Sequence, residues 1–251
     1  MVQIIEHEEF DAHCAHVIAA FPCVGLVATI TANFLIEEMG LKEVGIVDGE
    51  GFPSLCVVED GVPKNPVRMY HGQYKVKGEA KNLVVFLSEF QPDPTLIRPV
   101  AEAILGWCKE RGAELIVSAE GIVLEGEAAL DDIVEVYSVG STDRARKLLD
   151  QSTAPRFKDG IVAGVTGILL TLGKRDHFDV IGILSEAKQE YPDVRSAATV
   201  IEVLANMVGV EADVSRLYKE ADGFEAHVKD VAAKKRRHQE QAARSRELMF
   251  I

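Results

Sequence analysis

Short apolar runs alternate with helical stripes along most of this chain. A short apolar run between polar and turn residues is typical of a strand, and apolar residues spaced by three and four are typical of a helix. The pattern predicts strands at 15–21, 44–47, 55–58, 67–70, 83–87, 115–117, 133–139 and 180–184. It predicts helices at 26–39 and 94–111, with Gly40 and Gly112 just after their ends.

This alternation predicts an α/β fold with a mixed, largely parallel sheet flanked by helices. Residues 83–87 (LVVFL) form an uninterrupted apolar run, which is the pattern of a central strand covered on both faces. Residues 160–172 are rich in glycine and fit neither a helix nor a strand, so the pattern leaves them unassigned.

The C-terminal part predicts a helical extension of this fold. Asp193 is a candidate N-cap of a helix that Gly209 ends. A second helix starts near Asp213, and its apolar stripe continues to Val231. The stripe predicts that this second helix packs against other parts of the protein.

Beyond Val231 the apolar stripe stops. Residues 232–247 contain alanine as their only apolar residue type, so a helix there has no face to bury. We therefore expect an α/β core at 1–190, C-terminal helices packed on it at 191–232, and a projecting tail at 233–251.

The tail also differs in charge from the rest of the chain. The formal net charge of −13 argues against nucleic acid as a main partner, because phosphate binding needs a positive surface. From Ala226 onward, however, seven basic residues face three acidic ones. They are Lys229, Lys234, Lys235, Arg236, Arg237, Arg244 and Arg246 against Asp230, Glu240 and Glu247. A basic tail on an acidic body is typical of an interaction segment.

The sequence lacks the marks of a membrane or secreted protein. No run approaches the roughly 20 apolar residues that span a bilayer, and the start MVQIIEHEEF has neither a basic nor an apolar signal region. The four cysteines, Cys14, Cys23, Cys56 and Cys108, form no C-x-x-C pair, which predicts free thiols in a reducing compartment. We expect a cytoplasmic protein with no membrane partner.

Two stretches could suggest a metal or a cofactor, and we expect neither. His13 and His16 flank Cys14, but positions three apart in a strand lie on opposite faces, and the sequence places no fourth ligand nearby. The glycines of 160–167 match neither a dinucleotide fingerprint nor a P-loop, and close backbone packing explains them.

Ser88 and Glu89 are the strongest candidates for a catalytic site. They follow the predicted central strand, at the edge where α/β proteins bind ligands. A nucleoside- or phosphate-handling enzyme is therefore the alternative function. A serine nucleophile needs a positioned base, however, and G-x-S-x-G is absent. A buried basic residue at this edge would favour the enzyme, and an empty apolar groove with a free tail would favour an adaptor. Glu59 and Asp60 lie at a predicted turn, and we expect them to be solvated.

A series of short segments resembles the proteasome assembly chaperone family, in its archaeal and bacterial single-gene form. The segments are FPCVGLV (21–27), DGEGFP (48–53), VVEDG (57–61), VRMY (67–70), LVVFLSEFQPDP (83–94), the stretch 160–170 and YPDVRSAATVIEVL (191–204). No single segment is diagnostic, but their order and spacing together are specific. The resemblance covers about residues 15–225.

The resemblance implies a fold similar to nucleoside phosphorylases, homo-oligomers, and a role in assembling the proteasome core particle. It also implies docking by a C-terminal tripeptide of the form hydrophobic, tyrosine, any residue. By position these residues are Met249, Phe250 and Ile251, so Phe250 departs from the family's tyrosine by one hydroxyl. Some members are labelled ATP-dependent carboxylate–amine ligases, but no nucleotide-binding pattern occurs here. The sequence thus predicts a non-enzymatic chaperone without a cofactor, with proteasome core-particle subunits and itself as partners.

Overall fold

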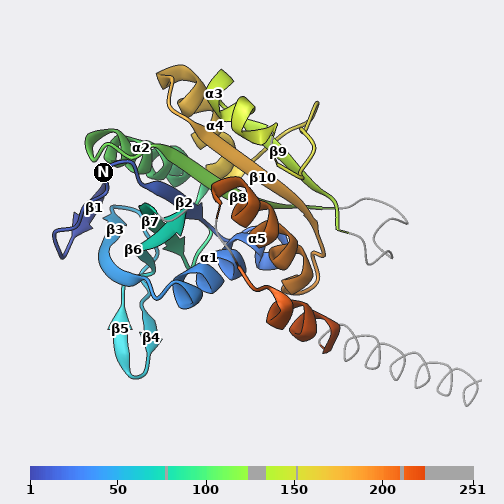
Figure 1. Cartoon of the computed structure of the whole chain (residues 1–251). Helices are drawn as coiled ribbons and strands as arrows, with labels where there is room; N and C mark the ends of the chain where they lie inside the picture. Colours follow the sequence, from blue (N-terminus) through green and yellow to red (C-terminus); the bar gives the residue numbers. More distant parts are fainter. Residues whose placement is uncertain (77–78, 124–133, 151, 210–211, 224–251) are drawn as a thin grey trace, which may run out of the picture. The chain divides into compact units, whose positions relative to one another are not determined.

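The computed structural model of the chain describes residues 1–76, 79–123, 134–150, 152–209 and 212–223 (Figure 1). The chain separates into two compact units, Met1–Ala212 and Asp213–Ile251. All the described strands belong to the first unit.

A mixed sheet of eight strands forms the centre of the first unit, in the order β1-β3-β6-β7-β2-β8-β10-β9. The strands are β1 (Val2–Glu6), β2 (His16–Ala20), β3 (Lys42–Gly49), β6 (Val67–Val76), β7 (Glu79–Ser88), β8 (Leu115–Val123), β9 (Val136–Gly140) and β10 (Val180–Ala187). Neighbours among β7, β2, β8 and β10 pair in parallel. All other neighbours pair antiparallel. The predicted α/β fold with a mixed sheet is confirmed.

Parallel pairing is confined to four adjacent strands, β7, β2, β8 and β10, so the parallel share of the sheet is smaller than the sequence indicated. The strands β6 and β7 are antiparallel neighbours over ten positions, from Val67 opposite Ser88 to Val76 opposite Glu79. An apolar run marks a strand as buried, but it does not state the direction of its neighbour. The pairing direction therefore came from the tertiary structure.

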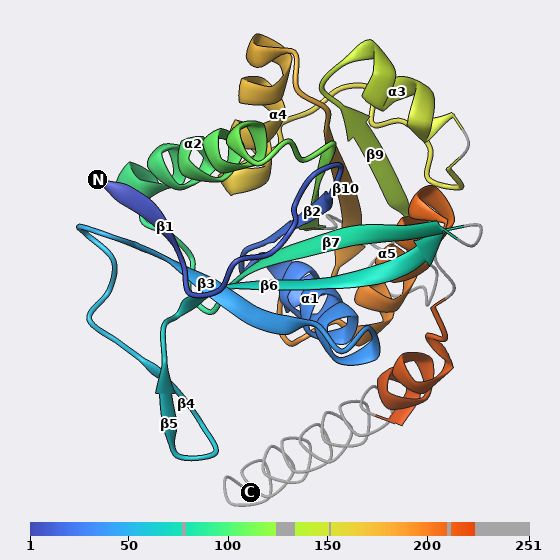
Figure 2. The ribbon, with the colours of Figure 1, turned by 60° about the vertical axis from the view of Figure 1, so that its left-hand side comes forward.

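A second, small sheet is the hairpin of β4 (Val57–Glu59) and β5 (Val62–Lys64). Asp60 and Gly61 both have positive φ, at 49° and 80°, as the two central residues of a type I′ turn require. The hairpin stands away from the large sheet (Figure 2). This confirms the turn that the Asp-Gly pair predicts.

Helices cover both faces of the large sheet. They are α1 (Val27–Glu38), α2 (Pro94–Glu110), α3 (Asp143–Leu149), α4 (Gly164–Asp176) and α5 (Val194–Val208), with a 3₁₀ turn, η1 (Val24–Leu26), before α1. The helices α1 and α5 pack on one face, and α2 and α4 on the other. Along β2, Ile18 and Ala20 join the first cluster, whereas Val17 and Ala19 join the second.

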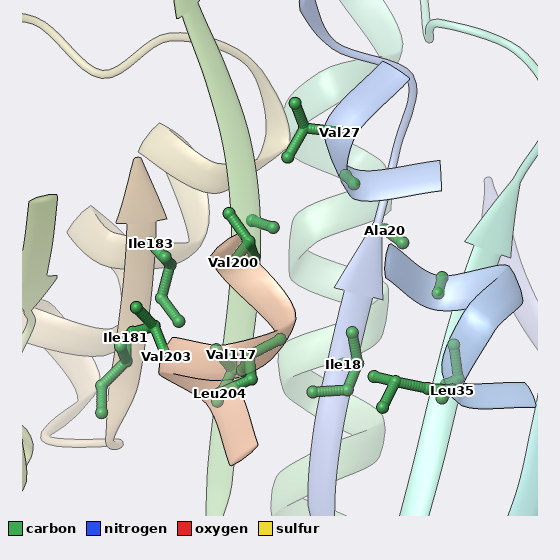
Figure 3. Close-up of a cluster of buried hydrophobic side chains, with 14 of the residues drawn as sticks. Ile18, Ala20, Val27, Leu35, Val117, Ile181, Ile183, Val200, Val203 and Leu204 are labelled. Carbon is green, nitrogen blue, oxygen red and sulfur yellow. The ribbon is translucent and has the colours of Figure 1, made fainter. Parts of the chain in front are cut away.

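The first of these clusters shows how the parallel strands acquire their cover. Ile18, Val117 and Ile183 project from three neighbouring strands (Figure 3). Leu35 of α1 and Leu204 of α5 pack over them. A central strand that is apolar on both faces needs helices on both sides, and the sheet meets this condition.

The helix ends follow local signals in the sequence. Asp193 accepts a hydrogen bond from the backbone amide of Ser196 at 3.0 Å and so caps α5. Gly209 after α5, Gly40 after α1 and Gly112 after α2 all have positive φ. The predicted ends of these three helices are confirmed.

The glycine-rich stretch 160–172 contains most of α4, which the sequence left unassigned. Gly167 lies in close backbone packing, because a Cβ there would be 2.1 Å from the carbonyl oxygen of Val162. The strand β1 and the helix α3 had no counterpart in the sequence prediction. Half-buried and exposed residues alternate over the five positions of β1, but Ile5 is apolar and exposed, so the sequence VQIIE carries only a weak strand signal.

The second unit is described for residues 213–223. Its helix spans 215–223, and Asp213 accepts a hydrogen bond from the amide of Ser215 at 3.0 Å. Val214, Leu217 and Ala221 of the predicted apolar stripe are buried. The helix predicted from Asp213 is confirmed this far. The predicted tail at 233–251 lies outside the described residues, and the proposed limits at 190 and 232 stay predictions.

Candidate functional site

Ser88 and Glu89 lie at the carboxyl end of β7, as the sequence predicted. Ser88 is fully buried, and its hydroxyl donates to the carbonyl of Phe90 at 2.8 Å. The same oxygen accepts the Phe90 amide at 3.3 Å. The contacts of Ser88 are thus those of a turn-forming residue rather than of a nucleophile next to a base.

Glu89 contacts a buried arginine. Arg68 of β6 is only 2% exposed, and its Nη2 lies 2.6 Å from Glu89 Oε1 and 3.1 Å from Glu59 Oε1. Glu59 also pairs with Lys64 at 2.9 Å, and the hydrogen bond from Lys64 lowers the pKa of this carboxyl. The buried basic residue that would favour an enzyme is therefore present, but it already forms ion pairs with two carboxylates of the same chain. Glu59 is exposed, as expected at a turn, and it also forms the ion pairs with Lys64 and Arg68, which the sequence did not indicate.

A second polar cluster occupies the same edge of the sheet, and the sequence analysis missed it. It joins Cys23 after β2, Ser118 and Glu120 of β8, and Thr166 of α4. Ser118 Oγ donates to the carbonyl of Ala19 at 2.9 Å and lies 2.8 Å from Thr166 Oγ1. Thr166 Oγ1 lies 2.8 Å from Glu120 Oε2. The predicted strand 115–117 was too short to include Glu120, which lies in the middle of β8.

The hydrogen bonds of this cluster are compatible with a protonated Glu120. Each hydroxyl has one hydrogen, and Ser118 uses its own on Ala19. If Glu120 is ionised, Thr166 donates to it, and no hydrogen is left for the contact between Thr166 and Ser118. If Glu120 is protonated, it can donate to Thr166, which then donates to Ser118. Burial also disfavours the charge and raises the pKa of Glu120 to about 7.

The thiol of Cys23 lies next to this carboxyl. Its Sγ accepts the amides of Gly121 at 3.2 Å and Ala28 at 3.4 Å. Burial, and secondarily the charge of Glu120, raises the pKa of Cys23 to about 11. The thiol therefore stays protonated near neutral pH, and the cluster contains a proton-binding carboxyl without an activated nucleophile.

Glu120 should make the stability of the protein depend on pH. Its folded pKa of about 7 lies above the ordinary glutamate value of 4.5, so the folded state binds more protons between these pH values, and stability falls as pH rises through this window. Relative to wild type, the free energy of unfolding of the Glu120→Gln protein should be higher by up to roughly 3 kcal/mol above pH 7 and by almost nothing below pH 4. Urea unfolding of both proteins from pH 4 to pH 8 measures the difference. A constant difference across this range would contradict the assignment.

The opposite edge of the sheet has an open polar cleft of about 520 Å³. Its lining is His13, Cys14, Val76, Glu79, Ala80, Lys81, Asn82 and Glu114. The two histidines of the sequence analysis separate here, because the exposed His13 lines the cleft while His16 is buried under it. His16 Nδ1 shares a 2.6 Å hydrogen bond with the Tyr74 hydroxyl, and burial lowers the pKa of His16 to about 4. Within the described part of the chain, no group of three or more His, Cys, Asp or Glu side chains is placed to hold a metal.

An apolar crease lies between α1, α5 and the sheet. It is lined by Ile18, Leu35, Met39, Tyr74, Leu83, Ile201, Leu204, Ala205, Val208 and Ala212. Its enclosed space of about 20 Å³ is too small for an organic ligand. Met249, Phe250 and Ile251 lie outside the described residues, so their predicted role stays a prediction. Among the helices described, none is both long and apolar enough to cross a membrane.

Comparison with known proteins identifies the family. The model of the PAC2 family matches residues 17–232, which is most of the chain and nearly the range of the resemblance in the sequence. The chain belongs to the PAC2 family. This confirms the resemblance to proteasome assembly chaperones that the ordered segments indicated. An uncharacterized protein of Methanocaldococcus jannaschii is 29% identical over 231 residues, covering 92% of this chain and 91% of its own length.

Two solved structures share the architecture over most or all of the chain. Pyrococcus furiosus PbaA, described as an archaeal homolog of proteasome-assembly chaperone, has 28% identity and a TM-score of 0.81, covering 100% of this chain and 99% of its own. Pyrococcus furiosus PbaB, described as an archaeal proteasome activator, has 20% identity and a TM-score of 0.79, covering 92% of this chain and 98% of its own. The likeness to PbaB shows the fold alone.

Proposed function

We propose that this PAC2-family protein is a non-enzymatic chaperone that assists assembly of the proteasome core particle in the cytoplasm. The observation that carries the proposal is the full-length likeness to PbaA, a homolog of proteasome-assembly chaperone. The family match over residues 17–232 supports it. Core-particle subunits are the proposed partners.

The proposed docking element is the final tripeptide, with Phe250 as the anchor. A buried aromatic ring is a frequent hot spot of a small interface. Met249 adds apolar contact, and the carboxylate of Ile251 can pair with a lysine in the partner's pocket. The missing tyrosine hydroxyl removes one hydrogen bond but leaves the ring that fills the pocket.

A single tripeptide binds weakly, because it buries little area and its ordering costs free energy. We propose that the protein is a homo-oligomer whose tails bind together. Linked sites raise avidity by roughly 10²- to 10⁴-fold where their geometry fits the partner. Light scattering at micromolar concentration gives the number of tails, and a monomer would remove the avidity argument.

The direct test is a pull-down of purified proteasome α and β subunits with the full chain and with a chain that ends at Leu248. Retention by the full chain and loss by the shortened one supports tail docking. Retention by both would move the interaction to the surface of the body, and retention by neither would contradict the chaperone function itself.

We also propose that the body has no catalytic activity. The contacts of Ser88 and Glu89 support this, because the hydroxyl bonds to its own turn and the carboxylate pairs with Arg68. Nucleoside phosphorolysis and ATP turnover should therefore equal the buffer blank. Turnover that Ser88→Ala or Glu89→Gln abolishes would establish the alternative, an enzyme at this edge of the sheet.

A further inference from the structure

The two edges of the large sheet differ in how they are protected. The strand β9 forms one edge, and residues 155–157 run along its outer side. There the Ser138 amide donates to the carbonyl of Pro155 at 2.8 Å, and the Phe157 amide donates to the carbonyl of Ser138 at 2.9 Å. The strand β1 forms the other edge (Figure 2). In the described part of the chain, β3 is the one strand that pairs with β1, so the outer side of β1 is open.

The pairing of β1 with β3 shows which backbone groups point outward. The His7 amide donates to the carbonyl of Val44 at 2.8 Å, so these two residues form a hydrogen-bonded pair of the antiparallel ladder. Hydrogen-bonded and non-hydrogen-bonded pairs alternate along such a ladder. The amides and carbonyls of Val2, Ile4 and Glu6 therefore point away from β3. The described residues give these six groups no hydrogen-bond partner.

The strand β1 also lacks the features that commonly protect a free edge. Such edges usually carry a proline, a lysine or a bulge. The sequence VQIIE contains no proline or lysine, and its register with β3 is unbroken from Val2 to Glu6. The one charged side chain, Glu6, is held within the chain, because Trp107 Nε1 donates to its Oε1 at 2.7 Å and Arg111 Nε lies 3.4 Å from the same oxygen. An open edge of this kind is a template for another strand.

We propose that β1 pairs antiparallel with β1 of a second copy of this chain, about a two-fold axis at Ile4. In this register Ile4 lies opposite Ile4 of the partner subunit, and Val2 lies opposite Glu6 of the partner subunit. All of these are hydrogen-bonded pairs, so each of the six outward groups of a strand has a partner. The inference rests on the proposed function, because it names the surface that joins two copies of the proposed homo-oligomer.

Charge and side-chain chemistry favour a second copy of the chain over a foreign strand. In this register the two Glu6 carboxylates lie at opposite ends of the paired strands, on the order of 13 Å apart, so like charges do not meet. Ile4 meets a second isoleucine, and β-branched side chains pack well on a pleated surface. A foreign strand would draw its specificity from pockets for alternate side chains. Neither of the two cavities described above is lined by a residue of β1.

Cysteine cross-linking tests the register directly. The background is a chain in which the exposed Cys14 and Cys56 are replaced by serine. Gln3 of one copy lies opposite Ile5 of the partner subunit in a non-hydrogen-bonded pair, with Cα atoms about 4.5 Å apart, which is within disulfide range. A mixture of the Gln3→Cys and Ile5→Cys proteins should therefore give a covalent dimer on a non-reducing gel after mild oxidation.

Each single variant alone is the matched control, because neither position lies opposite itself in this register. The Gln3→Cys protein and the Ile5→Cys protein should each stay largely uncross-linked. A mixture that does not cross-link, or single variants that cross-link as well as the mixture does, would overturn the proposal.

Ile4→Pro tests the hydrogen bonds at the axis. It removes an outward amide and leaves the bonds between β1 and β3 in place, as proline on an edge strand can. Five paired residues a side are far fewer than the roughly 20 to 30 of a standard interface, so we expect dimers in the micromolar range. In sedimentation over this range, Ile4→Pro should weaken self-association at least about tenfold, because two hydrogen bonds are lost, one from each copy. Ile4→Val keeps the amide and should associate as wild type does.

Unchanged self-association of the Ile4→Pro protein would also overturn the proposal. The pull-down with proteasome subunits is read separately from these measurements. Binding of the subunits without a cross-link in the cysteine mixture would remove this interface and leave the proposed function standing. A cross-link without such binding would support the interface and contradict the proposed function.

Discussion

Replacing Phe250 with alanine should weaken binding of the protein to proteasome core subunits by about thirtyfold per site, which corresponds to roughly 2 kcal/mol for a central aromatic anchor. Because several tails bind together, the loss for the oligomer should exceed the loss for a free peptide of the same sequence. Surface plasmon resonance with the oligomer and with the peptide measures both values. Equal losses would contradict multivalent docking.

The control for this experiment is Phe250→Tyr, which restores the family's hydroxyl and should bind as well as wild type or better. One extra residue after Ile251 should weaken binding, because it moves the carboxylate out of its pocket. All three variants should have the melting temperature of the wild type. Residues 232–247 have no apolar stripe, so the tail is expected to contribute little to the stability of the core. Wild-type binding by the Phe250→Ala protein would show that Phe250 is not the anchor.

The second large effect concerns the buried Arg68. Replacing both Glu59 and Glu89 with glutamine should destabilise the protein by about 3 kcal/mol, because it leaves an uncompensated charge on a buried side chain. For a chain of this size the melting temperature should fall by roughly 6–12 °C. Urea unfolding and calorimetry measure these quantities. Each single glutamine variant should cost less than the pair, since Arg68 Nη2 contacts both carboxylates.

Arg68→Met is the matched control, because it removes the charge and keeps most of the side-chain volume. Glu59 and Glu89 keep 44% and 29% of their side-chain surface exposed, so water can solvate them when the arginine is absent. This variant should cost about 1 kcal/mol or less. If Arg68→Met costs as much as the double glutamine variant, packing rather than charge determines the role of Arg68.

Predictions from the sequence were correct where neighbours along the chain decide the structure. The cap of α5 joins Asp193 to the amide three residues later, and a glycine with positive φ follows α1, α2 and α5. Such bonds form within one turn and depend little on the rest of the fold. For the same reason the Asp60-Gly61 turn could be read directly.

The candidate sites were harder to predict, because their chemistry depends on what covers each side chain. Arg68 is opposed by Glu89 from 21 positions away, and Thr166 reaches Glu120 across 46 positions. The pattern at 115–117 predicted a buried strand, but it did not indicate that Thr166 of α4 would contact Glu120 of that strand. Ser88 and Glu89 were placed correctly at the strand end, but the sequence did not show that Ser88 bonds to Phe90 and that Glu89 pairs with Arg68.

By itself the sequence determined the α/β class, the helices α1, α2 and α5 and the family, because periodicity, caps and ordered segments are local properties of the chain. The tertiary structure alone decided which strands run parallel, that burial raises the pKa of Glu120, that Arg68 is buried, and that His16 contacts Tyr74. These properties arise from desolvation and from contacts between distant segments. The sequence gives the chemical type of each side chain, whereas the fold determines its burial and its neighbours, and these set its pKa and its charge.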